Sequence, residues 1–119
     1  MRTADVQTKR AYAPRDEWDG KRILVDRLWP RGLTKEKAAV DLWLKDIAPT
    51  TELRKWFGHD PSRWDEFQKR YRNELKNNTG AVSALRRELE DGPVTLLFGA
   101  KDEEHNEAVV LRAVLERAR

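Results

Sequence analysis

The sequence predicts an α/β fold, in which a short, mostly parallel sheet of about three or four strands is flanked by helices. Residues 94–98 (VTLLF) are apolar and β-prone, and Gly92-Pro93 and Gly99 bound them, as is typical of a central strand. Segments with helical periodicity separate this strand from the earlier candidates, which favours right-handed crossover connections and a layered structure. A chain of 119 residues has the size of one compact domain, so residues 1–119 are expected to form a single α/β domain.

Three further segments are candidate strands. Residues 6–12 form a short one, and residues 22–28 form a second whose start, Ile23-Leu24-Val25, is typical of a strand buried on both faces. Pro30 and Gly32 end it. Residues 40–45 alternate apolar and polar side chains, which favours a half-buried strand with a helix as the alternative.

The helices are indicated by capping residues and by apolar side chains at steps of three and four. Thr34 can cap a short helix over residues 35–39, and Gly58 can close a helix over residues 52–57. Asp60 and Pro61 mark the start of the next helix. Its buried face is indicated by the apolar stripe Trp64, Phe67, Tyr71 and Leu75. The following helix has the stripe Val82, Leu85 and Leu89. The final helix, over about residues 103–117, has Val110, Leu111, Val114 and Leu115.

Composition excludes several classes of protein. The chain has no cysteine, which removes disulfides, thiolate nucleophiles and cysteine-rich zinc sites. It has no apolar run long enough to cross a bilayer, and the start (MRTADVQTKR) lacks the apolar core of a signal peptide. These features favour a cytoplasmic protein with no membrane partner.

The small net charge of +3 is unevenly distributed along the chain. Residues 1–40 hold ten Lys and Arg against six Asp and Glu, whereas residues 81–119 hold six against eight. A basic excess at one end of the chain is compatible with an anionic partner, although the long basic runs of a dedicated DNA-binding domain are missing.

Polar residues follow two of the predicted buried strands. If these strands are parallel neighbours, their following loops meet in a crevice at the carboxyl edge of the sheet, where α/β proteins bind ligands. The first loop supplies Asp26, Arg27, Trp29 and Arg31; the second supplies Gly99, Ala100, Lys101, Asp102, His105 and Asn106.

These residue types favour a pocket for an anion, because an arginine can hold a carboxylate or phosphate with two parallel hydrogen bonds. Gly32 and Gly99 would allow a ligand to approach the backbone closely. The candidate ligand-binding residues are Arg27, Trp29, Arg31, Gly32, Lys101 and Asn106, and the candidate proton-transfer residues are Asp26, His105 and Asp102.

Each assignment has a structural alternative. Asp26 and an arginine can form an ion pair that closes the top of the sheet, and Asp102 with its acidic neighbours can cap the last helix. Trp29 can stack on a base or simply cover the sheet edge. His59 fits a turn residue, and two histidines without close ligand spacing do not predict a metal site. No phosphate-loop, dinucleotide or serine-hydrolase motif is present, so the sequence identifies no cofactor.

Long strings of the sequence are also similar to a known family. VDRLWPRG at 25–32, LRKWFGHDPSRWDEF at 53–67 and TLLFGAKDEEHNEAVVL at 95–111 resemble the YeaO-like branch of DUF488, a domain of unknown function found in small prokaryotic proteins. The resemblance implies a small α/β domain, and it carries no activity or cofactor. Three groups of positions match the motifs: Asp26, Arg27, Trp29, Pro30, Arg31 and Gly32; Arg54, Trp56, Phe57 and His59; Ala100, Lys101, Asp102, His105 and Asn106. Phe98 stands where the family motif often has a tyrosine, so no hydroxyl is available there.

Three functional hypotheses follow. The first is a ligand-binding domain or small enzyme that recognises a phosphate or carboxylate through Arg27 and Arg31. The second is nucleic-acid binding, suggested by the basic first third with Trp18 and Trp29 interleaved. The third is an interaction module in which the Arg/Asp/His cluster is purely structural. The sequence leaves the ligand, the oligomeric state and the presence of catalysis open.

Overall fold

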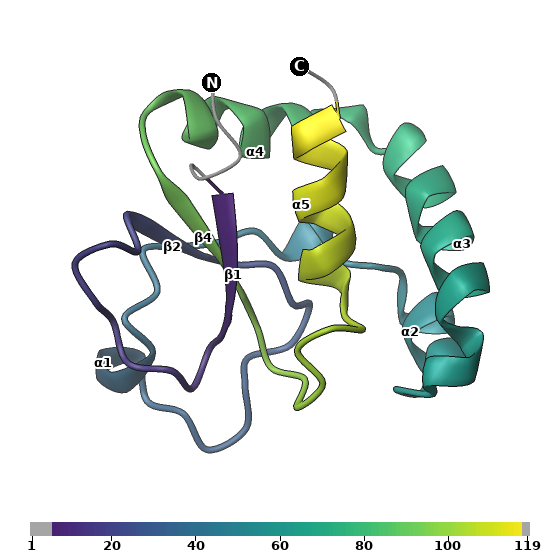
Figure 1. Cartoon of the computed structure of the whole chain (residues 1–119), viewed down its shortest axis with the longest axis horizontal. Helices are drawn as coiled ribbons and strands as arrows, with labels where there is room; N and C mark the ends of the chain where they lie inside the picture. The colour runs from purple at the N-terminus through teal and green to yellow at the C-terminus, as the bar shows by residue number, and fades with distance from the viewer. Residues whose placement is uncertain (1–5, 118–119) are drawn as a thin grey trace.

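Four parallel strands form one sheet in the computed structural model, which describes residues 6–117 (Figure 1). The spatial order is β1-β4-β2-β3. The strands are β1 (Val6–Arg10), β2 (Lys21–Leu24), β3 (Leu42–Trp43) and β4 (Val94–Phe98). The predicted α/β class with a short parallel sheet is therefore confirmed.

Strand β4 lies at the centre of the sheet and is buried along its whole length, as predicted. It pairs in parallel with β1 on one side and with β2 on the other. Strand β2 ends at Leu24, four residues before the predicted end, because the chain turns away to form the loop that precedes Pro30. The buried core of that prediction is confirmed, since Ile23 and Val25 are both fully buried.

Helices connect the strands and cover the sheet. They are α1 (Lys35–Ala38), α2 (Thr51–Phe57), α3 (Trp64–Lys76), α4 (Thr79–Glu90) and α5 (Glu107–Arg117). The short 3-10 helices are η2 (Lys45–Ile47) and η3 (Pro61–Arg63). No helix in the described part of the chain has both the length and the apolarity that crossing a membrane requires.

The predicted caps are present. Thr34 accepts a hydrogen bond from the backbone N–H of Lys37 at the start of α1, and Gly58 ends α2 with a φ of 53°. Asp60 caps the 3-10 turn η3, which leads into α3. The final helix starts later than predicted, at Glu107 rather than near residue 103, because residues 101–106 form a turn and the side chain of Asn106 accepts from the N–H of Val109.

The larger core lies between the sheet and helices α2 to α5. It combines Ile23, Val25, Leu96 and Phe98 from the sheet with the buried stripe of α3 and the inner face of α5. Phe67, Tyr71 and Leu75 supply the stripe of α3, and Trp64 packs at its edge as a partly buried side chain. Figure 1 shows α5 (yellow) beside β1 and β4, with α3 on the other side of α5.

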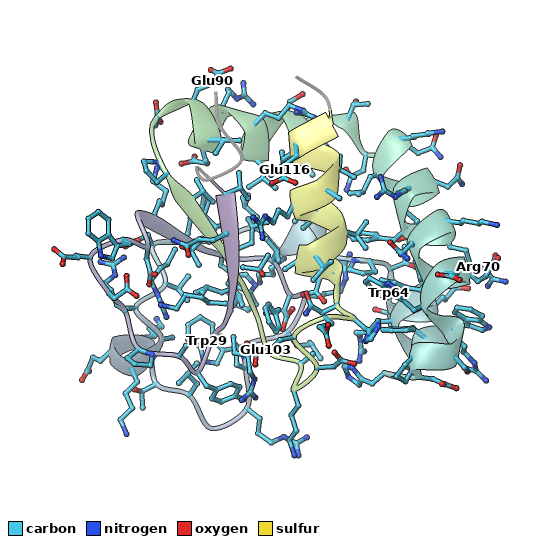
Figure 2. The ribbon with its side chains drawn as sticks, in the orientation of Figure 1. Trp29, Trp64, Arg70, Glu90, Glu103 and Glu116 are labelled. Atoms are coloured by element: carbon cyan, nitrogen blue, oxygen red, sulfur yellow. The ribbon has the colours of Figure 1, made fainter. Side chains whose placement is uncertain are left out.

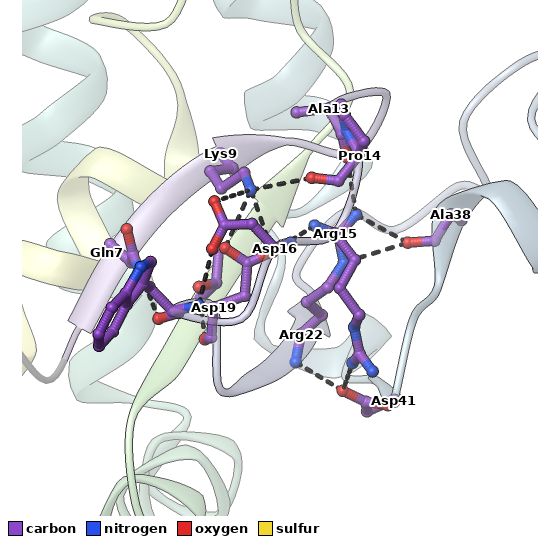
Figure 3. Close-up of polar contacts among 12 residues, drawn as sticks. Gln7, Lys9, Ala13, Pro14, Arg15, Asp16, Asp19, Arg22, Ala38 and Asp41 are labelled. Atoms are coloured by element: carbon purple, nitrogen blue, oxygen red, sulfur yellow. Dashed lines mark hydrogen bonds and ion pairs between the residues drawn. The ribbon is translucent and has the colours of Figure 1, made fainter.

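The opposite face of the sheet is covered by loops and the short helix α1, and it buries charge. Arg22 is fully buried, and its Nη1 donates to Asp19 at 2.8 Å, a carboxylate that is itself 1% exposed. Its other donors reach the carbonyls of Ala38 and Ala13 at 2.8 and 3.0 Å (Figure 3). Lys9 contacts the same carboxylate at 2.9 Å. This cluster fixes the loop between β1 and β2 against the sheet.

Burial by itself would raise the pKa of Asp19, but hydrogen bonds from Lys9 and Arg22 outweigh it, so the pKa is lowered below 3.8. A lowered pKa means that this carboxylate stabilises the folded chain at neutral pH and that the contribution is lost as the pH falls through the lowered value. Asp19 also fixes the sheet through its backbone, whose carbonyl accepts from the hydroxyl of Thr95 in β4 at 2.7 Å.

We expect Asp19→Ala to lower the free energy of unfolding by about 3–5 kcal/mol, because it leaves the guanidinium of Arg22 buried without its carboxylate. Urea denaturation followed by tryptophan fluorescence measures the change. Glu66→Ala is the matched control: it removes a carboxylate whose pair with Arg70 is half exposed, and it should cost less than about 1 kcal/mol. Similar losses in the two variants would contradict a stabilising role for the buried cluster.

Candidate functional site

A cavity of about 280 Å³ lies at the carboxyl edge of β2 and β4. Its walls come from the loops that follow these two strands, from Tyr12 after β1, and from Arg54, Phe57 and Phe67 on α2 and α3. The parallel register of β2 and β4, with Leu24 opposite Leu97, brings the two loops to the same edge of the sheet. This is the position that open α/β sheets use for ligands.

Six of the residues predicted for the site line this cavity. They are Asp26, Arg27, Trp29 and Arg31 from the loop after β2, and His105 and Asn106 from the loop after β4. Asn106 is 2% exposed, and both ends of its side-chain amide are engaged: it donates to the carbonyl of Asp102 and accepts from Val109. Its amide therefore holds the start of α5 in place.

Three other predicted residues do not line the cavity. Lys101 is exposed, and Gly32 lies in an exposed turn with a φ of 73°, a conformation that favours glycine without any ligand. Asp102 accepts from the backbone N–H groups of Glu104 and His105 at 2.9 and 3.1 Å, so it organises the turn before α5.

Arg27 and Arg31 occupy different environments within the cavity. Nε and Nη2 of Arg27 donate to the carbonyls of Pro49 and Ala48 at 3.3 and 3.2 Å, which orients the guanidinium. Arg31 is exposed, and its backbone carbonyl accepts from the hydroxyl of Tyr12 at 2.8 Å. Neither guanidinium forms an ion pair with a carboxylate of residues 6–116.

Trp29 is held in place by the protein itself. Its indole N–H donates to the carbonyl of Leu33 at 2.6 Å, and its ring packs edge-on against Trp43 with centroids 5.5 Å apart. In Figure 2, Trp29 lies toward α1, whereas Trp64 lies on α3. Trp18, the other tryptophan of the basic segment, is 77% exposed and does not line the cavity.

Four polar residues that line the cavity were not among the predicted site residues: Tyr12, Arg54, His59 and Glu107. Arg54 projects from α2, whose neighbouring positions Leu53 and Phe57 are buried in the core. His59 has a φ of 58° in the turn after α2, and its ring lies 6.4 Å from that of Phe57. Arg54 and His59 stand in a segment that resembles the family motif, which was the available signal.

Two carboxyl groups, from Asp26 and Glu107, also line the cavity. Oδ2 of Asp26 accepts from the backbone N–H of Gly99 at 2.8 Å. A Cβ at position 99 would lie 2.9 Å from this oxygen, so glycine leaves the space that Asp26 occupies. The close approach expected at Gly99 is thus made by a side chain of the protein.

Glu107 begins α5, and its Oε2 is buried without a hydrogen-bond partner among the described residues. Burial raises the pKa of Glu107 well above 4.5, and the hydrogen bond to Asp26 and the charge of Asp26 act in the same direction. A hydrogen bond from its own backbone N–H opposes them without outweighing them. Glu107 therefore keeps its proton well above the pH at which an exposed glutamate ionises, and this proton can be donated to Asp26.

His105 connects the cavity to the acidic turn. Its Nδ1 lies 2.8 Å from Oδ2 of Asp102, and its ring packs edge-on against Trp64 with centroids 5.1 Å apart. The hydrogen bond from His105 is the main reason that the pKa of Asp102 is lowered. These contacts fix the orientation of the imidazole at the cavity wall. Within the described residues, no three His, Asp or Glu side chains are grouped to hold a metal ion.

A family model described as "Inactive DUF488-N3 subclade" matches residues 5–119 of the chain. The uncharacterized protein YeaO of Escherichia coli is 43% identical over 107 residues, which cover 90% of this chain and 93% of YeaO. The uncharacterized protein Rv3073c of Mycobacterium tuberculosis is 39% identical over 115 residues, which cover 97% of each chain. No solved structure is significantly similar to the chain. With a family model matched over nearly its whole length, the chain belongs to the YeaO-like proteins of the DUF488 family.

Proposed function

We propose that this protein binds a small ligand through a phosphate or carboxylate group, and that Arg27, Arg31 and Arg54 recognise that group. The observation that carries the proposal is their common position: all three line one cavity at the carboxyl edge of the sheet. None of them pairs with a carboxylate of residues 6–116. Guanidinium groups that face a cavity without an internal carboxylate partner are suited to an external anion.

Arg27 supports the proposal by its geometry. A guanidinium has five N–H donors in a fixed plane. The carbonyls of Ala48 and Pro49 accept from two of its nitrogens and hold this plane in a defined orientation. The remaining donors are therefore pre-organised, which lowers the entropic cost of binding an anion.

The two carboxyl groups of the cavity do not neutralise the arginines. Burial raises the pKa of Glu107 well above 4.5, so Glu107 is neutral below this raised pKa. Asp26 is then the one charged carboxyl group of the two. The cavity then places three guanidinium groups against one carboxylate, and its net charge favours an anionic ligand.

Binding without a catalysed reaction is the form of the proposal that we favour. The matching family model is described as an inactive subclade. This description supports a protein that recognises its ligand and leaves it unchanged.

Isothermal titration with inorganic phosphate, ribose 5-phosphate and succinate tests the anion site. We expect at least one of these probes to bind, and Arg54→Ala and Arg31→Ala to weaken it about tenfold each, since a hydrogen bond to a charged group contributes about 1.5–3 kcal/mol. Lys101→Ala is the matched control, because it removes one exposed positive charge outside the cavity lining. It should change the affinity less than twofold.

Equal losses for Lys101→Ala and the two arginine variants would show a general charge effect and contradict a specific site. The stability of Arg31→Ala separates binding from a structural network. Because the side chain of Arg31 is exposed and has no carboxylate partner among residues 6–116, its removal should change the free energy of unfolding by less than about 0.5 kcal/mol. A large loss of stability would favour the interaction module.

The protonated state of Glu107 predicts a pH dependence of stability. The folded chain holds a proton that the unfolded chain releases above about pH 4.5, so the wild type should lose stability as the pH rises from there through the raised pKa. Glu107→Gln stays neutral, and its melting temperature relative to wild type should therefore increase over the same interval. Glu103→Gln removes an exposed carboxyl of the same loop as a control. A constant difference between Glu107→Gln and wild type at all pH values would contradict a buried, protonated Glu107.

A further inference from the structure

The carboxyl pair of Asp26 and Glu107 has acceptor capacity that the protein does not use. The carboxylate of Asp26 accepts from the backbone N–H of Gly99 through Oδ2 and from the protonated Glu107, which leaves further lone pairs without a donor among the described residues. Oε2 of Glu107 is buried and accepts none from them. A buried carboxyl oxygen without a partner costs free energy, and a ligand that donates a hydrogen bond would remove this cost.

The same cavity holds the three arginines of the proposed anion site. Donors and acceptors are thus both offered to one ligand. We propose that Asp26 and Glu107 bind a neutral N–H donor of the same ligand whose anionic group contacts the arginines. This inference rests on the proposed function, and it names the ligand class: an anion joined to an amide or to a heterocyclic ring that carries an N–H.

A neutral donor fits the cavity better than an ammonium group. Asp26 and a protonated Glu107 together carry one negative charge, whereas Arg27, Arg31 and Arg54 line the same space and would repel a second cation. His59 and His105 also face the cavity and add no negative charge. An ammonium would in addition lose its hydration in a partly apolar site, which is costly without a full counter-charge.

The walls of the cavity suit a planar group. Phe57 and Phe67 both line it, and their rings stack with centroids 4.4 Å apart. Pro30 and Pro49 contribute further buried apolar surface. Flat amides and heterocyclic rings pack well against such surfaces, and their in-plane N–H groups remain available to a carboxyl pair.

Two variants, Glu107→Gln and Asp26→Asn, test the two carboxyl groups separately. Glu107→Gln replaces the protonated acid with an amide that can still donate to Asp26, so it preserves the acceptor face. Asp26→Asn replaces a carboxylate with an amide whose NH₂ opposes an incoming N–H, while its carbonyl can still accept from Gly99. The melting temperature of each variant shows whether it is folded.

Isothermal titration with two matched pairs of probes tests the proposal. Succinamate and monomethyl succinate share charge and size, but only succinamate carries N–H donors. Uridine 5′-monophosphate and its N3-methyl derivative differ in the same way. We expect the donor-bearing member of at least one pair to bind wild type at least tenfold more tightly. This preference should persist in Glu107→Gln and fall below threefold in Asp26→Asn.

Three outcomes would overturn the inference while the anion site stands: equal affinity within both pairs, a preference that survives in Asp26→Asn, or tighter binding of 4-aminobutyrate, which carries an ammonium group, than of succinamate. If no probe, including inorganic phosphate, ribose 5-phosphate and succinate, binds the wild type, the proposed function fails and this inference fails with it. The results therefore distinguish failure of the N–H donor inference from failure of the proposed anion site.

Discussion

The parallel pairing of β2 with β4 places the loops after both strands at one edge of the sheet, and the cavity is built from these loops. The backbone N–H of Gly99, directly after β4, donates to Asp26, two residues after β2. This hydrogen bond joins the loops across the sheet. The indole N–H of Trp43 in β3 holds the loop after β2 as well, because it donates to the backbone carbonyl of Asp26 at 2.7 Å. This arrangement positions the cavity residues of these two loops, whereas Arg54, Phe57 and Phe67 come from α2 and α3.

The pairing requires the chain to cross from β1 to β2 over β4 without a helix, and buried charge makes this connection specific. Loop 11–20 buries little apolar surface, since Ala11 is its only residue in the smaller core. Asp19 and Arg22 close it instead, with Lys9 and backbone carbonyls satisfying the remaining groups. Breaking such a pair is costly because it leaves an uncompensated buried charge, so the pair holds the loop in one conformation.

The charged and titratable side chains of the cavity differ in exposure. Arg31 and Arg54 are exposed at the cavity, and Arg27 is half-buried against backbone carbonyls. Oε2 of Glu107 is buried, and the raised pKa of this carboxyl keeps it neutral where an ionised carboxylate would be costly. A cavity arranged in this way can attract an anion over its outer part and offer hydrogen-bond acceptors within, so both proposals depend on the same ordering.

The sequence alone determined the α/β class, the central strand β4, the caps at Thr34, Gly58 and Asp60, and the edge of the sheet at which polar residues gather. These features depend on local periodicity and on the conformations of particular residues, which neighbouring positions reveal. Only the tertiary structure decided that Arg54 and Glu107 line the cavity with Asp26, and that Arg22 is buried with Asp19. The physical reason is that burial and pairing depend on contacts between segments far apart in the chain. An arginine at the start of a strand or a glutamate at the start of a helix looks, in sequence, like any solvated residue.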